Sequence, residues 1–218
     1  MTFTAPVLNY AQLAPMLIVL AGALIGVLIE AFAPRASRHT SQLFIAVASL
    51  VAAFAALVRV RNQSSVDAAM GSVGFDGAGV LLQGTILIIA LLSVFLIADQ
   101  ENFTALAAAV PGSSEERESL QLDLRVTEVY PLTLFAVAGM LLFPVSTDLI
   151  TLFVALEMLS LPLYLMAGLS RRRRLMSQES ALKYFLLGAF SSAFFLFGVA
   201  YLYGYSNSVT FAGIQASI

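Results

Sequence analysis

Apolar residues occur in six long runs along the chain, and polar residues gather between the runs. A helix that spans a bilayer needs about 20 mostly apolar residues. We therefore expect transmembrane helices at residues 11–33, 42–60, 79–98, 129–145, 149–170 and 177–204. The fourth run is short, but Glu128 and Asp148 bound it, and it is just long enough to cross.

No run shows the period-two alternation of barrel strands, and backbone groups in lipid must then be satisfied within helices. The expected fold class is therefore an all-α polytopic membrane protein, with residues 1–218 forming a single transmembrane domain. The first nine residues contain no Lys or Arg, whereas a cleaved signal peptide starts with a basic region. We expect the first run to be retained as a helix.

Composition supports a membrane protein and excludes several other classes. Hydrophobic residues make up 60% of the chain and charged residues 11%, against about 25% charged residues in soluble domains. The net charge of −2 gives no basic face for nucleic acid. The absence of cysteine excludes disulfides, iron–sulfur ligation and thiol catalysis on this chain, and the single histidine, His39, argues against a multi-histidine metal or haem site.

The arginines of the connecting segments indicate an orientation. Eight fall on one side of the expected helices, and only Arg59 and Arg61 fall on the other. The eight are Arg35, Arg38, Arg117, Arg125, Arg171, Arg172, Arg173 and Arg174. Because basic residues mark cytoplasmic segments, we expect the loop 99–128 and the arginine run in the cytoplasm and the N-terminus outside.

Small and polar residues near the helices have simpler expected roles. Gly22 and Gly26 in the first run, and Gly188, Ser191 and Ser192 in the sixth, are expected to allow close helix packing. Glu30 ends the first run near the interface, where we expect it to be solvated.

Glu157 is the strongest candidate for chemistry. It lies nine residues past Asp148, which is about 13 Å into a hydrocarbon core about 30 Å thick. A carboxylate at that depth must be paired, hydrated or protonated, and such acids mark proton or ion pathways, although an acid that only links helices is the alternative. Pro162 frees the carbonyl of Met158, which suits either a hydrated pocket or a tolerated bend.

Lys183 is the second candidate. It lies roughly 6–12 Å inside the sixth helix on the cytoplasmic half. A buried amine can accept and pass on a proton. Two structural alternatives are a side chain that extends to the interface and an i,i+4 pair with Glu179.

Two segments resemble a known family. Residues 148–164 read DLITLFVALEMLSLPLY and residues 179–194 read ESALKYFLLGAFSSAF. They resemble the fifth and sixth helices of the antiporter-like membrane subunits of respiratory complex I, the proton-translocating NADH:quinone oxidoreductase, and the second is most similar to subunit N. The resemblance implies that Glu157 and Lys183 belong to a proton relay.

The resemblance also sets limits on the chain. The family's fold has about fourteen helices in inverted repeats, and its broken seventh helix carries a further lysine. None of that follows in this sequence, so we expect the N-terminal part only, a fragment or a shortened gene product, which would not pump protons alone.

The resemblance implies other membrane subunits as partners in a bacterial plasma membrane. NADH, FMN, the iron–sulfur clusters and quinone would lie on those partner subunits, with no cofactor on this chain. Two other functions remain open: a subunit of a multisubunit cation/proton antiporter, and a structural membrane scaffold.

Overall fold

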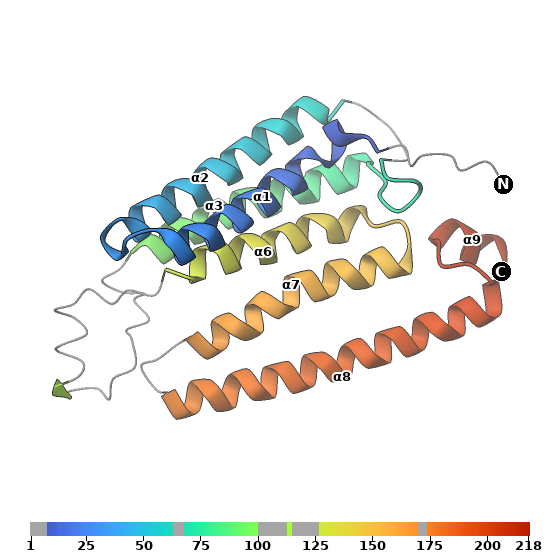
Figure 1. Ribbon diagram of the computed structural model, residues 1–218. Coiled ribbons are helices and arrows are strands. Elements are labelled where there is room, and N and C mark those ends of the chain that lie inside the picture. Colours follow the sequence, from blue (N-terminus) through green and yellow to red (C-terminus); the bar gives the residue numbers. More distant parts are fainter. Residues whose placement is uncertain (1–7, 63–67, 100–112, 115–126, 170–173) are drawn as a thin grey trace.

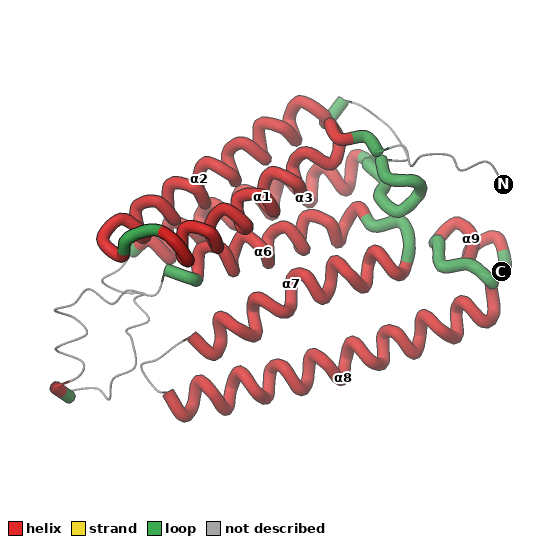
Figure 2. The backbone as a smooth tube through the Cα atoms, viewed as in Figure 1, coloured by secondary structure: helices red, strands yellow, loops and turns green. Residues whose placement is uncertain are grey.

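The computed structural model describes residues 8–62, 68–99, 113–114, 127–169 and 174–218. Over these residues the chain is a bundle of antiparallel helices without an extended sheet (Figures 1 and 2). Five of the helices are long and apolar enough to span a bilayer, and the helical stretch Val129–Val145 is shorter. These findings confirm the expected all-α polytopic class with about six transmembrane helices.

The first three helices are α1 (Tyr10–Phe32), α2 (Arg35–Val60) and α3 (Gly77–Ala98). Pro34 separates α1 from α2, and Ala33 before it adopts the extended backbone that a following proline favours. The helix α2 starts seven residues before the expected residue 42, since a helix can continue past the apolar core into polar residues at its boundary. At α3, the carboxylate of Asp76 caps the first turn by accepting from the amide of Gly79 at 2.6 Å.

The second half contains α6 (Val129–Leu142), the 3₁₀ turn η1 (Phe143–Val145), α7 (Leu149–Leu169) and α8 (Arg174–Ser206). Pro144 ends the α-helical hydrogen-bonding pattern of α6, and the 3₁₀ turn completes the short fourth crossing. A six-residue helix, α9 (Phe211–Ala216), follows α8. The sequence did not predict α9, because six residues are too few to form a recognisable apolar period.

Small residues and buried glutamines hold α1, α2, α3 and α6 together. A Cβ atom on Gly22 would overlap the Ser49 side chain of α2, and one on Gly26 would lie 2.9 Å from Gln42 and 3.0 Å from Pro131. This confirms the close packing expected at both glycines of α1. The fully buried Gln83 donates to the Leu141 carbonyl at 2.9 Å, which links α3 to α6 within the apolar bundle.

One end of the bundle is closed by hydrogen bonds between connecting segments. The amide of Gly74 donates to the Val145 carbonyl at 2.9 Å, and the amide of Thr147 donates to the Ser72 carbonyl at 3.1 Å. Farther along, the amide of Leu149 donates to the Val209 carbonyl at 3.0 Å. The segments before α3, α7 and α9 therefore form one connected layer, at the right of Figure 1.

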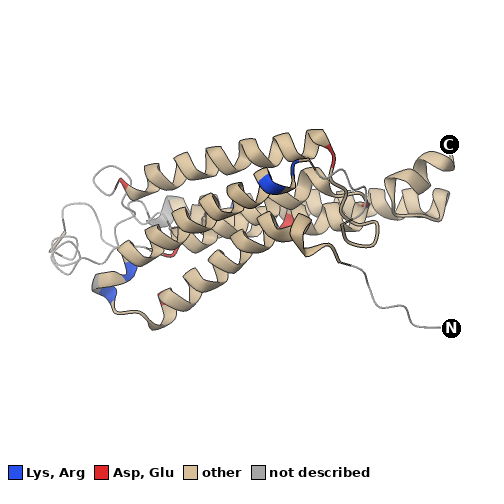
Figure 3. Cartoon of the chain, turned by 90° about the horizontal axis from the view of Figure 1, so that it is seen from above, with Lys and Arg blue, Asp and Glu red and all other residues tan. Residues whose placement is uncertain are grey.

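Charged residues are sparse along the bundle (Figure 3). Arg35 and Arg38 at the start of α2 lie at the same end of the bundle as Arg174 at the start of α8, whereas Arg59 lies in the last turn of α2 at the other end. This arrangement matches the expected separation of arginine-rich and arginine-poor connecting segments to opposite ends of the bundle, on which the expected orientation depends. The side of the membrane that each end faces stays a prediction. The expected loop arginines Arg117, Arg125 and Arg171 to Arg173 lie outside the described residues.

Candidate functional site

The helix α7 begins at a well-formed N-cap that sets the depth of Glu157. Asp148 is 6% exposed, and its carboxylate accepts from the amides of Ile150 at 2.9 Å and Thr151 at 2.8 Å. The Thr151 hydroxyl adds a third hydrogen bond at 2.7 Å. Because the cap fixes the first turn, Glu157 lies two and a half turns inside the helix.

One face of α7 packs against α6. The backbone of Met158 and Leu159 lies against Gly139, where a Cβ atom would be 2.9 Å from the Met158 carbonyl carbon. Pro162, one helical turn after Met158, lies on the same face and is buried. The Met158 carbonyl, which lacks a helical donor because Pro162 has no N–H, is therefore on the α6 side. This position favours a tolerated bend at Pro162 over a hydrated pocket beside Glu157.

The opposite side of α7 packs against α8 along an antiparallel seam. Four pairs of residues follow one another along this seam: Phe153 with Phe195, Glu157 with Ser192, Tyr164 with Gly188, and Gly168 with Ala181. The rings of Phe153 and Phe195 stack with centroids 6.0 Å apart. A Cβ atom on Gly188 would overlap the Tyr164 hydroxyl, and one on Gly168 would lie 3.4 Å from the Ala181 Cβ.

Glu157 is half-buried in this seam, and Oε1 of its carboxylate accepts a hydrogen bond from the Ser192 hydroxyl. Within the described part of the chain, this hydroxyl is the polar partner of an acid in the middle of a spanning helix. A carboxylate held by a single hydroxyl can gain or lose a proton without breaking an ion pair. This arrangement can support proton exchange as well as helix linkage.

The structure does not bring Lys183 to Glu157. Lys183 lies nine residues before Ser192 on α8, which is roughly 13 Å along the axis and half a turn away around it. Its side chain is 69% exposed on the side of α8 away from α7, where it forms an ion pair with Glu179. This is the i,i+4 pair that the sequence offered as a structural alternative, and exposed pairs of this kind stabilise helices only weakly.

Glu30 is held in a polar network rather than solvated as expected. Its carboxylate accepts from Arg38 at 3.0 Å, from the Gln42 amide at 3.1 Å and from the Thr127 hydroxyl at 2.6 Å. Gln42 is almost fully buried and also donates to the Gly26 carbonyl at 2.8 Å. The network ties the end of α1 to the start of α2 and to the residue before Glu128, which explains why the side chain of Glu30 is only 18% exposed.

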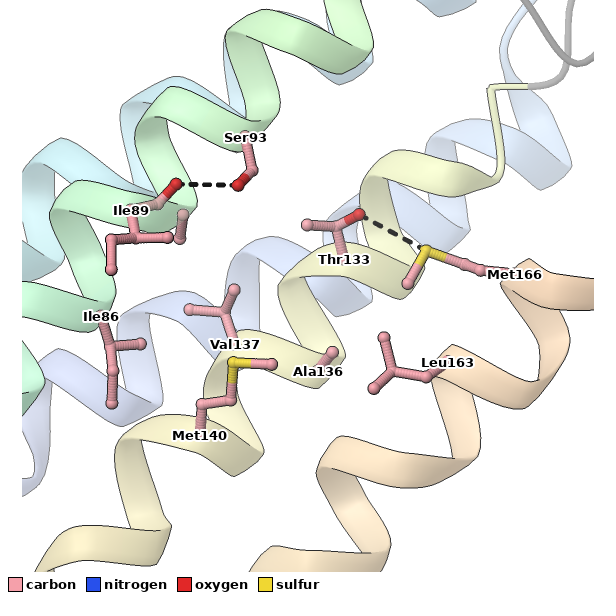
Figure 4. Close-up of a pocket in the computed structure, with 10 residues that line it drawn as sticks. Ile86, Ile89, Ser93, Thr133, Ala136, Val137, Met140, Leu163 and Met166 are labelled. Carbon is pink, nitrogen blue, oxygen red and sulfur yellow. Dashed lines mark hydrogen bonds between the residues drawn. The ribbon is translucent and has the colours of Figure 1, made fainter. Parts of the chain in front are cut away.

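A pocket of about 250 Å³ lies between α3, α6 and α7 (Figure 4). Its lining is apolar apart from the hydroxyls of Ser93 and Thr133, which donate to the carbonyls of Ile89 at 2.9 Å and Val129 at 2.7 Å. Thr133 also lies 3.6 Å from the Met166 sulfur. Among the described residues that line this pocket none has an ionisable side chain, so they offer no group for proton transfer.

Sequence reasoning missed the contribution of Ser192 and Tyr164 to the candidate site. Ser192 was expected only to allow close packing, and Tyr164 was not singled out. A signal was present in the spacing, because Glu157 and Tyr164 are seven residues apart and Gly188 and Ser192 are four apart. Each pair lies on one helix face. Predicting that the two faces meet would require knowing the register between α7 and α8, however.

Comparison with known proteins gives a consistent family assignment. A family model described as "NADH:quinone oxidoreductase/Mrp antiporter, TM" matches residues 146–218, which include α7 and α8. Among solved structures, a chain of respiratory complex I from Thermus thermophilus superposes with a TM-score of 0.66 and 29% identity, over 90% of this chain and 38% of that chain. A chain of an archaeal membrane-bound sulfane sulfur reductase has the same fold, with a TM-score of 0.68 at 19% identity over 95% of this chain and 40% of that one.

Curated relatives are more similar in sequence. NADH-quinone oxidoreductase subunit N of Rhodococcus opacus is 52% identical over 242 residues, which cover 100% of this chain and 45% of the relative. The subunit N of Acidothermus cellulolyticus is 52% identical over 98% of this chain and 42% of the relative. The chain spans less than half the length of these relatives, which fits the expectation that only part of the subunit is matched. The chain belongs to the family of NADH-quinone oxidoreductase subunit N.

Proposed function

We propose that this chain is part of a proton-translocating membrane subunit of NADH:quinone oxidoreductase, in which Glu157 and Lys183 are proton-relay groups. The observation that carries the proposal is the mid-helix carboxylate of Glu157, half-buried between α7 and α8 with Ser192 as its hydroxyl partner. Intramembrane acids of this kind are expensive to maintain and are functional by default. The similarity of the whole chain to subunit N supports the same role.

The chain contributes proton chemistry and no redox chemistry in this proposal. Electron transfer from NADH through FMN and iron–sulfur clusters to quinone would take place on partner subunits. Quinone reduction there would change the environment of Glu157 and Lys183 through conformation or charge. The carboxylate of Glu157 would accept a proton, and the amine of Lys183 would then accept or release a proton.

The position of Lys183 implies that further groups complete the relay. Lys183 and Glu157 lie on opposite sides of α8, and roughly 13 Å separates their levels along that helix. The face that carries Lys183 also presents the exposed aromatic side chains of Phe190, Phe194 and Phe197. An exposed aromatic face that also carries the Lys183 amine suits contact with additional helices of the assembly. A polar group on those helices would connect to Lys183.

The proposed setting is the bacterial plasma membrane, with the N-terminus outside and the arginine-rich segments in the cytoplasm. The apolar spans and the uneven distribution of arginines support this orientation. The partners would be the other membrane subunits of the oxidoreductase and the surrounding lipid.

A cation/proton antiporter subunit is the second candidate, since the description of the matched family model includes Mrp antiporters. The whole-chain similarity to subunit N at 46–52% identity favours the oxidoreductase. A purely structural scaffold is the third candidate, and in that case the Glu157–Ser192 hydrogen bond would serve helix packing alone.

The test is Glu157→Gln in the assembled oxidoreductase. Glutamine keeps the shape of the side chain and a hydrogen bond to Ser192 but does not titrate. We expect normal assembly with reduced proton pumping and a reduced coupled oxidoreductase rate, while Glu157→Asp retains much of both. The matched control is Glu179→Gln, which alters an exposed acid on α8. A Glu157→Gln enzyme that assembles and pumps at the wild-type rate would leave Glu157 as a helix-packing residue.

A further inference from the structure

The seam between α7 and α8 differs on the two sides of Glu157. Toward the start of α7, the next contact is the stack of Phe153 on Phe195, which contains no polar atom. Toward the end of α7, the next contact is the Tyr164 hydroxyl against Gly188, and the Tyr164 ring then meets the Tyr184 ring with centroids 4.7 Å apart. Among the described contacts of this seam, hydroxyl groups therefore follow Glu157 only toward the end of α7.

Gly188 determines where the Tyr164 hydroxyl lies. That hydroxyl occupies the space that a side chain at position 188 would fill, so only glycine permits it. Gly188 and Ser192 are four residues apart on one face of α8, and Cβ positions at this spacing are about 5–6 Å apart. A single water molecule with two hydrogen bonds of about 2.8 Å spans a gap of that size, so one water would link the Tyr164 hydroxyl to Ser192.

We propose that the hydroxyls of Ser192 and Tyr164 form a relay through which Glu157 exchanges its proton with the end of the bundle where α7 ends and α8 begins. The inference rests on the proposed function for its biological meaning, and it assigns a route and two further residues to the acid. In the other direction the next contact of the seam is the Phe153–Phe195 stack, which offers no group for proton transfer. Beyond that stack lies the hydrogen-bonded layer of connecting segments that includes Leu149 and Val209.

The proton balance of the relay requires water along the route and hydronium from the solvent as the proton donor. Ser192 passes its hydroxyl proton to Oε1 of Glu157 and takes one from a water molecule between Ser192 and Tyr164. That water is replenished by the Tyr164 hydroxyl, which receives a proton from a hydronium ion in the solvent at the end of the bundle, and a neutral water molecule is left there. Each hydroxyl finishes with one proton, and the net result is one proton moved to Glu157. Rotation of the hydroxyls then restores the starting orientation.

Hydrogen–deuterium exchange at the Glu157 carboxyl tests the route directly. The 218-residue chain is placed in lipid nanodiscs, transferred to heavy water at acidic pH, and followed by infrared spectroscopy of the protonated carboxyl stretch. Glu157→Gln must remove the band and so assign it. We expect Tyr164→Phe and Ser192→Ala each to slow the exchange roughly tenfold, which corresponds to about 1.4 kcal/mol in the barrier. Ser192→Thr restores a hydroxyl and should restore the rate.

Matched controls separate a relay from a packing effect. Ser191→Ala and Tyr201→Phe remove hydroxyls from other faces of α8, and Tyr201 is 68% exposed, so neither should alter the exchange rate. Wild-type exchange in both Tyr164→Phe and Ser192→Ala would overturn the proposal, as would equal slowing in the controls. A spectrum in which Glu157→Gln removes no band would also overturn it. Because the measurement needs no assembled enzyme, its outcome is independent of whether Glu157→Gln affects pumping.

Discussion

Gly139 of α6 lies directly against the backbone of α7 at Leu159. A Cβ atom on Gly139 would be 2.5 Å from the amide nitrogen of Leu159 and 3.0 Å from the Ala155 carbonyl oxygen. Neither of these atoms can rotate away, because both belong to the helix backbone. The contact holds the α6 side of α7 and so fixes which side of that helix presents Glu157 to α8.

Gly139→Ala is therefore expected to destabilise the bundle by about 1–3 kcal/mol, since an added methyl group forces α6 and α7 apart. The measurement is the thermal or denaturant unfolding of the chain in lipid nanodiscs. Gly198→Ala is the matched control, because nothing lies within 4 Å of a Cβ atom at position 198. Equal stability of the two variants would show that α7 can shift to accommodate a side chain.

A second prediction concerns the network around Glu30. Glu30→Ala leaves Arg38, Gln42 and Thr127 without their common acceptor, and Gln42 and Thr127 are buried. Unsatisfied buried donors cost about 1–3 kcal/mol, so we expect a loss of stability in that range. The same unfolding measurement checks it.

The control for Glu30 is Glu179→Ala, which removes an acid from an ion pair with side chains 63% and 69% exposed. Exposed pairs contribute about 0–1 kcal/mol, so this variant should unfold close to the wild type. If Glu30→Ala were as stable as Glu179→Ala, the network would be a consequence of the packing of α1 and α2 rather than a contributor to it.

The membrane orientation gives a third prediction. The chain contains no cysteine, so a single introduced cysteine is the only thiol. We expect Asn62→Cys, after α2, to react with an impermeant maleimide added to intact cells, and Ser37→Cys, at the start of α2, to react only after the membrane is opened. Both positions are exposed in the structure. The reverse labelling pattern would place the N-terminus in the cytoplasm.

Apolar runs predicted most of the helices, because the bilayer core imposes a minimum apolar length on any spanning segment. They were less informative at helix ends. The first turns of α2, from Arg35 to Ser41, consist mostly of polar residues, which a hydropathy pattern assigns to a loop. The close approach at Gly22 and Gly26 followed from residue size alone.

The candidate site was predictable only in part. The depth of Glu157 follows from counting residues along one helix, so the sequence identified it as a candidate. Its contact with Ser192 depends on the register between two helices, which a single sequence does not encode in any short pattern. Glu30 looked like a solvated terminal acid, because Gln42 and Thr127, which surround it, are 12 and 97 residues away.

The last prediction separates two roles for Lys183. If Lys183 only pairs with Glu179, then removing either partner should have the same small effect on the assembled oxidoreductase. The proposed relay instead requires a titrating amine at position 183, on a face of α8 that the described residues leave exposed. We therefore expect Lys183→Ala to lower turnover and pumping, while Glu179→Ala leaves both close to wild type. Lys183→Arg should rescue poorly, because guanidinium does not release its proton in proteins. Turnover and proton pumping in membrane vesicles measure the difference, with assembly checked on native gels. Equal activities for Lys183→Ala and Glu179→Ala would assign Lys183 to the ion pair alone.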